Sequence, residues 1–140
     1  MTTRPEDLNF DHIGVVVSDL KTGDEVLCTL FPIVGASEIY IDPLINVKVV
    51  FLTDSAGIRY ELISPLNDKS PLNSVLKTRK DVINHVAYTT TRFDEAIEYY
   101  KSAGCLALGE PTPAVAFDNN RVIFFITSIG AIIEIVEAKS

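Results

Sequence analysis

Alternating apolar and polar positions open each half of this chain. Residues 10–17 alternate as a β-strand, and residues 20–31 then place apolar side chains at helical spacing. The second half repeats this order, with an apolar run from residue 84 and a helix predicted over 93–103 that Gly104 ends. Three shorter strands follow each helix, at 37–41, 47–53 and 58–63 in the first half and at 106–108, 121–126 and 131–136 in the second. Each half is therefore predicted to be β-α-β-β-β.

A shift of 73 residues brings the two halves into register. It places His12 on His85 and Glu61 on Glu134, so that 49 residues separate histidine from glutamate in both halves. When residues 12–63 are laid on 85–136, eight of 52 pairs are identical. They are His12/His85, Glu25/Glu98, Asn46/Asn119, Val49/Val122, Phe51/Phe124, Ser55/Ser128, Gly57/Gly130 and Glu61/Glu134. The matches fall on the ligand-type residues, on one strand and on a Ser-x-Gly turn, which indicates an internal duplication.

The segment SPLNDKSPLNSVLKTRKD, residues 64–81, reads as a linker that carries a short helical pattern at Leu72, Val75 and Leu76. The length of 140 residues predicts a single domain, 1–140, with repeats at about 8–66 and 82–137. Hydrophobic residues make up 47% of the chain and charged residues 22%, as in globular proteins.

Composition also excludes several classes of partner. No apolar run approaches the roughly 18 residues of a membrane helix, so we expect no membrane contact. The N-terminus MTTRPEDLNF lacks the pattern of a signal peptide, so we expect a cytoplasmic protein. A net charge of −7 argues against nucleic acid as a partner. A small-molecule substrate is the remaining expectation.

Strand alternation predicts where the histidines point. Ile13, Val15 and Val17 form the bulkier face, which we place against the helix, so His12 points to the opposite side beside Gly14. A carboxylate such as Glu134, inside the run AIIEIVE, is costly to bury unless it is paired, hydrogen-bonded or metal-bound. A lone histidine or glutamate on a strand is more often structural, but the shared spacing favours a metal site.

Two imidazoles and two carboxylates suit a divalent first-row metal that keeps exchangeable positions. We therefore predict that His12, Glu61, His85 and Glu134 bind one divalent ion, either cobalt, nickel, manganese or zinc.

The repeated module with these four residues resembles the vicinal oxygen chelate superfamily, which includes glyoxalase I, methylmalonyl-CoA epimerase, extradiol dioxygenases and drug-resistance proteins. The segments DHIGVVVSDL and YELISPLNDKSPLNSVLKTRKDVINHVAY are most similar to the epimerase branch. The resemblance implies an α+β fold in which tandem βαβββ modules form an open eight-stranded mixed barrel around a metal cleft. It implies a metal-dependent epimerase or isomerase that chelates its substrate through two neighbouring oxygens; we also expect a homodimer.

The chain departs from the epimerase pattern at the catalytic base. Epimerases usually carry a glutamate at the position that Leu44 occupies here, in Pro43-Leu44-Ile45-Asn46-Val47. We therefore expect Glu61 and Glu134 to act as catalytic bases as well as ligands, by abstracting an α-proton to form a metal-bound enolate. Asp42 and Asp118 are weaker candidates and are more typical of turns. The first helix also departs, because it contains Lys21-Thr22-Gly23.

The substrate stays open between several classes. An acyl-CoA thioester would need cations for its phosphates, which Lys69, Lys77, Arg79 and Lys80 in the linker, or Lys48 and its repeat counterpart Arg121, would supply unless they are simply solvated. The same ligands also suit a glyoxalase I-type lyase or isomerase acting on a hemithioacetal. A non-catalytic drug-binding protein and a structural dimeric module are the alternatives outside enzymes. An extradiol dioxygenase is disfavoured, because iron oxygenases use one carboxylate rather than two.

Overall fold

The computed structural model describes residues 3–78 and 83–139. The first half contains β1 (Asn9–Val16), α1 (Leu20–Leu30), β2 (Ile33–Ala36), β3 (Tyr40–Asp42), β4 (Val47–Asp54) and β5 (Arg59–Pro65), and α2 (Leu72–Thr78) follows in the linker. The second half contains β6 (Ile83–Thr90), α3 (Phe93–Ser102), β7 (Leu106–Ala107), β8 (Thr112–Pro113), the 3-10 turn η1 (Val115–Phe117), β9 (Arg121–Ile126) and β10 (Ile132–Glu137). The three helices lie where the apolar spacing predicts them.

The residues group into two compact units. We call them the His12 unit, His12–Asn84, and the His85 unit, Met1–Asp11 together with His85–Ser140. β1 begins in the His85 unit and ends in the His12 unit, and β6 does the reverse. Each unit contains one helix of the repeat, α1 or α3.

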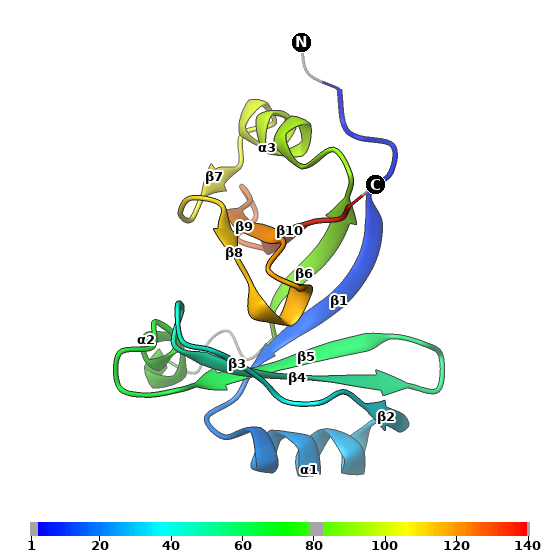
Figure 1. The fold of residues 1–140 in the computed structure, drawn as a ribbon, viewed down its shortest axis with the longest axis vertical. Helices are drawn as coiled ribbons and strands as arrows, with labels where there is room; N and C mark the ends of the chain where they lie inside the picture. Colours follow the sequence, from blue (N-terminus) through cyan, green and yellow to red (C-terminus); the bar gives the residue numbers. More distant parts are fainter. Residues whose placement is uncertain (1–2, 79–82, 140) are drawn as a thin grey trace. The chain divides into compact units, whose positions relative to one another are not determined.

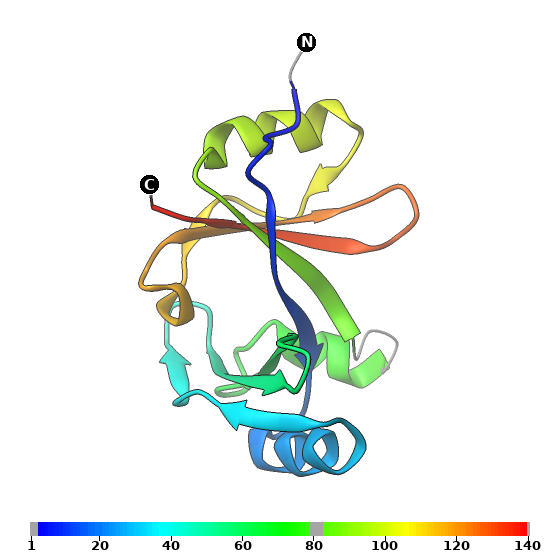
Figure 2. The same cartoon turned by 90° about the vertical axis from the view of Figure 1, so that its right-hand side faces the viewer.

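In the His12 unit the strand order is β2-β4-β5-β1, and β3 also pairs with β4. β1 and β5 are parallel, whereas β4 is antiparallel to β5, β2 and β3. α1 lies along one side of the β4–β5 pair (Figures 1 and 2). The buried core of the His12 unit consists of Val15, Leu20, Leu27, Val50, Leu52 and Leu62, with Ile13, Val17, Ile33 and Tyr60 packed against it. The face of β1 predicted to pack on the helix therefore does so.

In the His85 unit the order is β6-β10-β9-β7, and β8 also pairs with β9. β6 and β10 are parallel, and β9 is antiparallel to β10, β7 and β8. α3 covers one side of β9 and β10 (Figures 1 and 2). The buried core of the His85 unit likewise lies between the helix and the strands, and it consists of Phe93, Ala96, Ile97, Ile123, Phe125 and Ile135.

The same strand register occurs within each of the two units. Gly14 of β1 faces Glu61 of β5, and Ala87 of β6 faces Glu134 of β10. Adding 73 to the first pair of residue numbers gives the second pair, so the repeat predicted from the sequence is also a repeat of strand pairing.

Backbone conformation explains two of the eight identical pairs, Asn46/Asn119 and Gly57/Gly130. Asn46 and Asn119 both adopt the left-handed conformation, with φ of 58° and 63°. Gly57 and Gly130 do the same, at 85° and 82°. Asparagine and glycine tolerate positive φ better than other residues, so the two halves keep them where the chain turns in the same way.

The strands in the described residues number ten rather than the eight that we predicted. In each half, the single strand predicted after the helix is two short strands, β2 and β3 in the first half and β7 and β8 in the second. The predicted strand 37–41 falls mostly between β2 and β3. Ser37 donates its N–H to the carbonyl of Phe51, but its Oγ accepts the N–H of Phe51 at 2.9 Å. The Ser37 side chain thus replaces its own carbonyl beside β4 and interrupts the strand.

The first turn of α1 accounts for the unusual Lys21-Thr22-Gly23 sequence. The carboxylate of Asp19 caps the helix by accepting the N–H and the hydroxyl of Thr22, both at 3.0 Å. Gly23 is buried against Val17, and a Cβ atom there would lie 2.9 Å from Val17 Cγ1. In the described part of the chain, α1 at 11 residues is the longest helix, and no helix is long and apolar enough to span a membrane.

Candidate metal centre

A histidine and a glutamate meet inside the His12 unit. His12 lies on β1 two residues before Gly14, the residue that faces Glu61 on the parallel strand β5. Because side chains alternate along a strand, His12 and Gly14 share a face, and the small glycine leaves room for the imidazole. His12 Nε2 lies 3.6 Å from Glu61 Oε1, and the two side chains are 0% and 5% exposed.

The His85 unit contains the same pair on β6 and β10. His85 lies two residues before Ala87, which faces Glu134. His85 Nε2 lies 3.1 Å from Glu134 Oε1, and both side chains are buried. The structure therefore joins each predicted histidine to the glutamate that lies 49 residues further along the sequence.

A phenylalanine ring packs against the histidine of each His–Glu pair. Phe51 of β4 faces Glu61, and Phe124 of β9 faces Glu134. The ring of Phe51 meets the His12 imidazole edge to face, with centroids 5.7 Å apart, and Phe124 meets His85 in the same way at 5.1 Å. The site predicted from the sequence does not include these phenylalanines. Their identity under the 73-residue shift was the available signal.

The chemistry of these side chains fits a divalent cation. His12, Glu61, His85 and Glu134 are all buried and form a group of the kind that can hold a metal ion. Buried carboxylates are costly unless a cation compensates their charge. Imidazole nitrogen and carboxylate oxygen together suit zinc, nickel, cobalt or manganese, and the lack of cysteine differs from most structural zinc sites.

Arg59 adds a positive charge to the His12 unit. It lies on β5 two residues before Glu61, and its guanidinium carbon lies 4.2 Å from the centroid of Phe51. At this distance a cation is attracted to the face of an aromatic ring. The residue at the corresponding position of the repeat is Ile132, so this charge has no equivalent in the His85 unit.

The turn before β4 carries no proton acceptor at the position where epimerases usually have their base. Leu44 is 64% exposed. Asp42 is buried, and its Oδ1 accepts the N–H groups of Leu44 at 3.1 Å and Ile45 at 3.4 Å. Asp118 adopts the left-handed conformation at the end of η1. Asp42 and Asp118 are thus turn residues, as their sequence context indicates.

The cations proposed for phosphate binding have different surroundings. Arg121 is held by Glu137 Oε2 at 2.7 Å and by Asp94 Oδ1 at 3.3 Å, so its charge is compensated within the His85 unit. The Glu137 carboxylate raises the pKa of Arg121, and hydrogen bonds from Arg121 lower the pKa of Glu137. Lys69 precedes α2 in the chain, and Lys77 lies in the last turn of α2. Arg79 and Lys80 lie outside the described residues.

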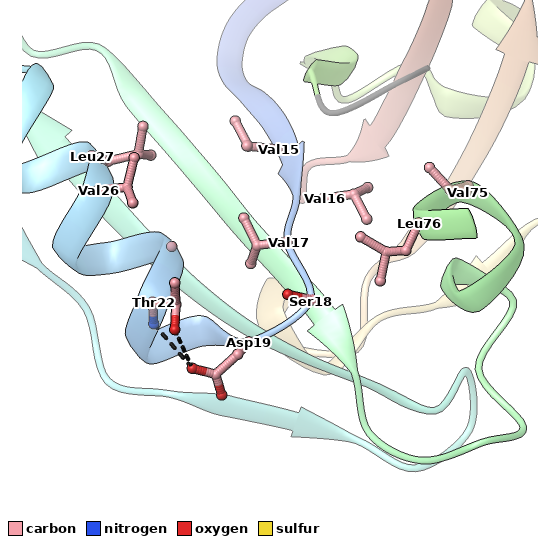
Figure 3. Close-up of a pocket in the computed structure, with 11 residues that line it drawn as sticks. Val15, Val16, Val17, Ser18, Asp19, Thr22, Val26, Leu27, Val75 and Leu76 are labelled. Carbon is pink, nitrogen blue, oxygen red and sulfur yellow. Dashed lines mark hydrogen bonds between the residues drawn. The ribbon is translucent and has the colours of Figure 1, made fainter. Parts of the chain in front are cut away.

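A separate cavity of about 300 Å³ opens where β1 ends. Its apolar part is lined by Val17, which directly follows β1, by Val26 and Leu27 of α1, and by Leu76 of α2 (Figure 3). Asp19, bonded to Thr22, lies at its polar side. The first lining residue along the chain is Val15, three residues after His12. Neither His12 nor Glu61 lines this cavity.

Comparison with known families and structures agrees with this architecture. The family model described as Glyoxalase/Bleomycin resistance protein/Dioxygenase superfamily matches residues 11–124. No curated protein matches the chain significantly.

Three solved structures are similar to the whole chain. A hypothetical protein from Bacillus halodurans C-125 has a TM-score of 0.81 at 25% identity, over 96% of this chain and 97% of that one. Methylmalonyl-CoA epimerase from Mycobacterium tuberculosis has a TM-score of 0.80 at 21% identity, over 100% and 94%. A variant of the Streptomyces coelicolor epimerase, in complex with 2-nitronate-propionyl-CoA, has a TM-score of 0.76 at 19% identity, over 100% of both chains.

Proposed function

Because this chain belongs to the glyoxalase/bleomycin resistance/dioxygenase superfamily, we propose that it is a metal-dependent isomerase of the epimerase type. In this proposal His12, Glu61, His85 and Glu134 bind one divalent ion, and residues 1–140 act as a single domain. The observation that carries the proposal is the pairing of a buried histidine with a buried glutamate at the same strand register in both units.

The proposed reaction begins with removal of an α-proton. A bound divalent ion polarises a carbonyl oxygen and stabilises the negative charge that develops on it. Glu61 and Glu134 are the groups that accept and donate the proton, because the side chain of Leu44 can do neither. An epimerase must remove a proton from one face of the substrate and return one to the other. One carboxylate from each repeat supplies the two groups that this requires.

An acyl-CoA thioester is the substrate class that we favour. The similar Streptomyces epimerase is in complex with 2-nitronate-propionyl-CoA, a ligand of this class. In this chain the basic residues Lys69 and Lys77 lie beside and within α2 and can meet the phosphates of such a substrate.

Leu44 supports a second candidate function. An exposed leucine at that position favours chemistry in which a ligand carboxylate is the base, as expected of a glyoxalase I-type isomerase or lyase acting on a hemithioacetal. It equally favours a protein that binds a small molecule, such as a drug, without turnover.

Metal analysis and proton exchange separate these functions. We expect one equivalent of cobalt, nickel, manganese or zinc per chain after loading, and exchange of the substrate α-proton with deuterium from solvent. Exchange into acyl-CoA thioesters supports the epimerase, whereas exchange into hemithioacetals alone supports the glyoxalase type. A loaded protein that exchanges neither is a binding protein. A protein that takes up no divalent metal contradicts the proposal.

A homodimer and a cytoplasmic location stay predictions. Light scattering during gel filtration checks the first, and fractionation of cells that express the tagged chain checks the second.

A further inference from the structure

Another cavity, of about 440 Å³, lies within the His85 unit. The N-terminal segment, which runs beside α3 (Figures 1 and 2), contributes to its wall Arg4, Pro5, Glu6 and Leu8. The rest of the wall consists of Tyr88 of β6, Tyr100 of α3 and Ile133 of β10. A volume of this size is in the usual range for a small-molecule site.

This cavity is separate from the candidate metal centre. Tyr88 lies three residues after His85, and Ile133 directly precedes Glu134, so strand alternation turns both away from the His85–Glu134 pair. Both pack instead against the buried core between α3 and the strands. A ligand in the cavity would therefore lie on the helix side of the sheet and would not contact the metal ligands.

The N-terminal wall is held in place from inside the unit. Pro5 is fully buried. The carboxylate of Asp7 accepts the N–H of Thr91 at 2.8 Å, and Leu8 packs against the core. The cavity is thus preformed on this side.

The two tyrosines bring fixed rings and available hydroxyls. The ring of Tyr88 meets Phe10 edge to face at a centroid distance of 6.0 Å, and the ring of Tyr100 lies 5.7 Å from that of Phe125. Neither hydroxyl forms a hydrogen bond with another of the described residues. Burial raises the pKa of Tyr100, the Tyr88 hydroxyl raises it further and the Arg4 guanidinium lowers it, so these three polar groups lie near one another.

The repeat shows that the hydroxyls are not needed for packing. A shift of 73 residues places Tyr88 on Val15 and Tyr100 on Leu27. Val15 and Leu27 are both part of the buried core of the His12 unit. Aliphatic side chains therefore suffice at these two positions, and the pair of tyrosines is a property of the second half alone.

The charges around the cavity favour a ligand that carries both signs. Arg4 supplies one positive charge and Glu6 one negative charge, and both side chains are exposed and available. A ligand with a single charge would leave one of them beside a like charge, whereas a zwitterion complements both. The apolar and aromatic part of the wall, with Leu8 and Ile133, suits a large apolar group.

We propose that this cavity binds a free α-amino acid with a large apolar side chain. Arg4 and the tyrosine hydroxyls hold its carboxylate, Glu6 holds its ammonium group, and the apolar wall covers its side chain. The proposal does not depend on the metal-dependent function, because none of the metal ligands takes part.

An NMR titration of the ¹⁵N-labelled protein tests this with three probes. L-Phenylalanine carries both charges, 3-phenylpropionate lacks the ammonium group, and 2-phenylethylamine lacks the carboxylate. We expect L-phenylalanine to shift the amide signals of Leu8, Tyr88 and Tyr100 and to leave those of Gly14 and Glu61 in place. Each of the other two probes should bind about fivefold more weakly or worse, the scale of one exposed ion pair.

Charge-removing variants assign each group of the ligand. Arg4→Gln should weaken binding of L-phenylalanine and 3-phenylpropionate about fivefold and leave 2-phenylethylamine unchanged. Glu6→Gln should weaken L-phenylalanine and 2-phenylethylamine and leave 3-phenylpropionate unchanged. Lys21→Gln and Glu38→Gln, which remove exposed charges of the other unit, are the matched controls and should bind all three probes as wild type does.

Two double variants test the tyrosines. Tyr88→Val combined with Tyr100→Leu introduces the residues that the first half has at these positions, and it should lose most of the binding. Tyr88→Phe combined with Tyr100→Phe keeps both rings, so it covers the case in which the first pair does not fold. It should weaken L-phenylalanine about fivefold, the scale of one lost hydrogen bond.

Three results would overturn the proposal. The first is the absence of any shift around Leu8, Tyr88 and Tyr100 at saturating solubility of L-phenylalanine. The second is equal affinity of wild type for L-phenylalanine and for either singly charged probe, which would show that a zwitterion is not recognised. The third is unchanged binding in both tyrosine double variants.

Discussion

At the scale of single residues, each buried glutamate has two fixed neighbours, a histidine on the parallel strand and a phenylalanine on the antiparallel one. These neighbours hold the carboxylate in one place, which matters for a group that must both bind a metal and move a proton. The two roles can be separated, because glutamine keeps an oxygen for the metal but cannot accept a proton at neutral pH.

Glu61→Gln and Glu134→Gln therefore test the catalytic role. We expect at least one of them to lower turnover by about 10²-fold, the usual scale for a general base, while substrate affinity changes less. Steady-state kinetics with a substrate identified by proton exchange provides the measurement. Metal content, measured in parallel, must stay at the wild-type level. Unchanged turnover in both variants would rule out these glutamates as bases.

Phe51→Ala tests the contact between the ring and His12. Phe51 is 4% exposed, and removing a buried phenylalanine side chain typically costs about 3–5 kcal/mol of unfolding free energy. We expect weaker cobalt binding as well, because the imidazole loses the surface that orients it. Denaturant unfolding and cobalt titration measure the two effects. Phe31→Ala is the matched control: Phe31 is 37% exposed and packs on Tyr60, so its loss should be smaller and should leave cobalt binding unchanged.

At the scale of elements, the two helices of the repeat approach their sheets differently. Gly23 of α1 lies against Val17, whereas the corresponding residues of the second half are Ala96 and Thr90. Ala96 is fully buried, so α3 accommodates at this point a Cβ atom that α1 does not.

Gly23→Ala should consequently destabilise the protein, although alanine favours helices by about 1 kcal/mol over glycine. The new Cβ atom would lie 2.9 Å from Val17 Cγ1, and overpacking of this kind typically costs about 1–3 kcal/mol. Thermal unfolding of single and double variants provides the measurement. Val17→Ala combined with Gly23→Ala should recover part of the loss beyond the sum of the two single effects. A more stable Gly23→Ala single variant would show that α1 can move away from β1.

Asp7 ties the N-terminal segment to the start of α3. Its carboxylate accepts hydrogen bonds from the hydroxyls of Thr90 and Thr91 and from the Thr91 N–H. The bond from Thr90 and then those from Thr91 lower the pKa of Asp7 to about 2 from an ordinary value of 3.8. A group whose pKa falls on folding stabilises the protein above its unfolded pKa and loses this contribution as the pH falls through the folded value.

We therefore expect Asp7→Asn to be less stable than wild type above about pH 4, with a difference that shrinks between pH 4 and pH 2. Denaturant unfolding across this range provides the measurement. Asp68→Asn, which removes a carboxylate from the exposed linker, controls for the change in net charge. A difference between Asp7→Asn and wild type that does not vary with pH would contradict the hydrogen bonds seen here.

At the scale of the whole molecule, the buried carboxylates couple metal binding to folding. A ligand that binds only the folded state at 1,000 times its Kd adds about 4.1 kcal/mol of stability. We expect chelator-treated protein to unfold several degrees below cobalt- or nickel-loaded protein. Differential scanning calorimetry provides the measurement. Mg²⁺, which prefers all-oxygen ligands, should have little effect, and the Glu61→Gln, Glu134→Gln double variant should lose most of the shift. Equal melting temperatures with and without metal would contradict the ligand set.

Local patterns along the chain were sufficient to predict the repeat, the three helices, most of the strands and the side of β1 on which His12 lies. Each depends on a period of two or 3.6 residues, or on a spacing that the two halves share, and neither requires knowledge of distant contacts. The histidine–glutamate pairs could be anticipated for the same reason, because one spacing relates both.

Other features were decided only by contacts between segments far apart in the chain. The edge-to-face packing of Phe51 on His12 depends on the register of β4 against β5, which no local period encodes. The division of one predicted strand into β2 and β3 depends on how Ser37 bonds to Phe51, 14 residues away. Arg59 is a strand residue with no special signal until its guanidinium is seen over Phe51. The sequence by itself thus determined which residues repeat and which way they face, and the pairing of strands decided what they touch.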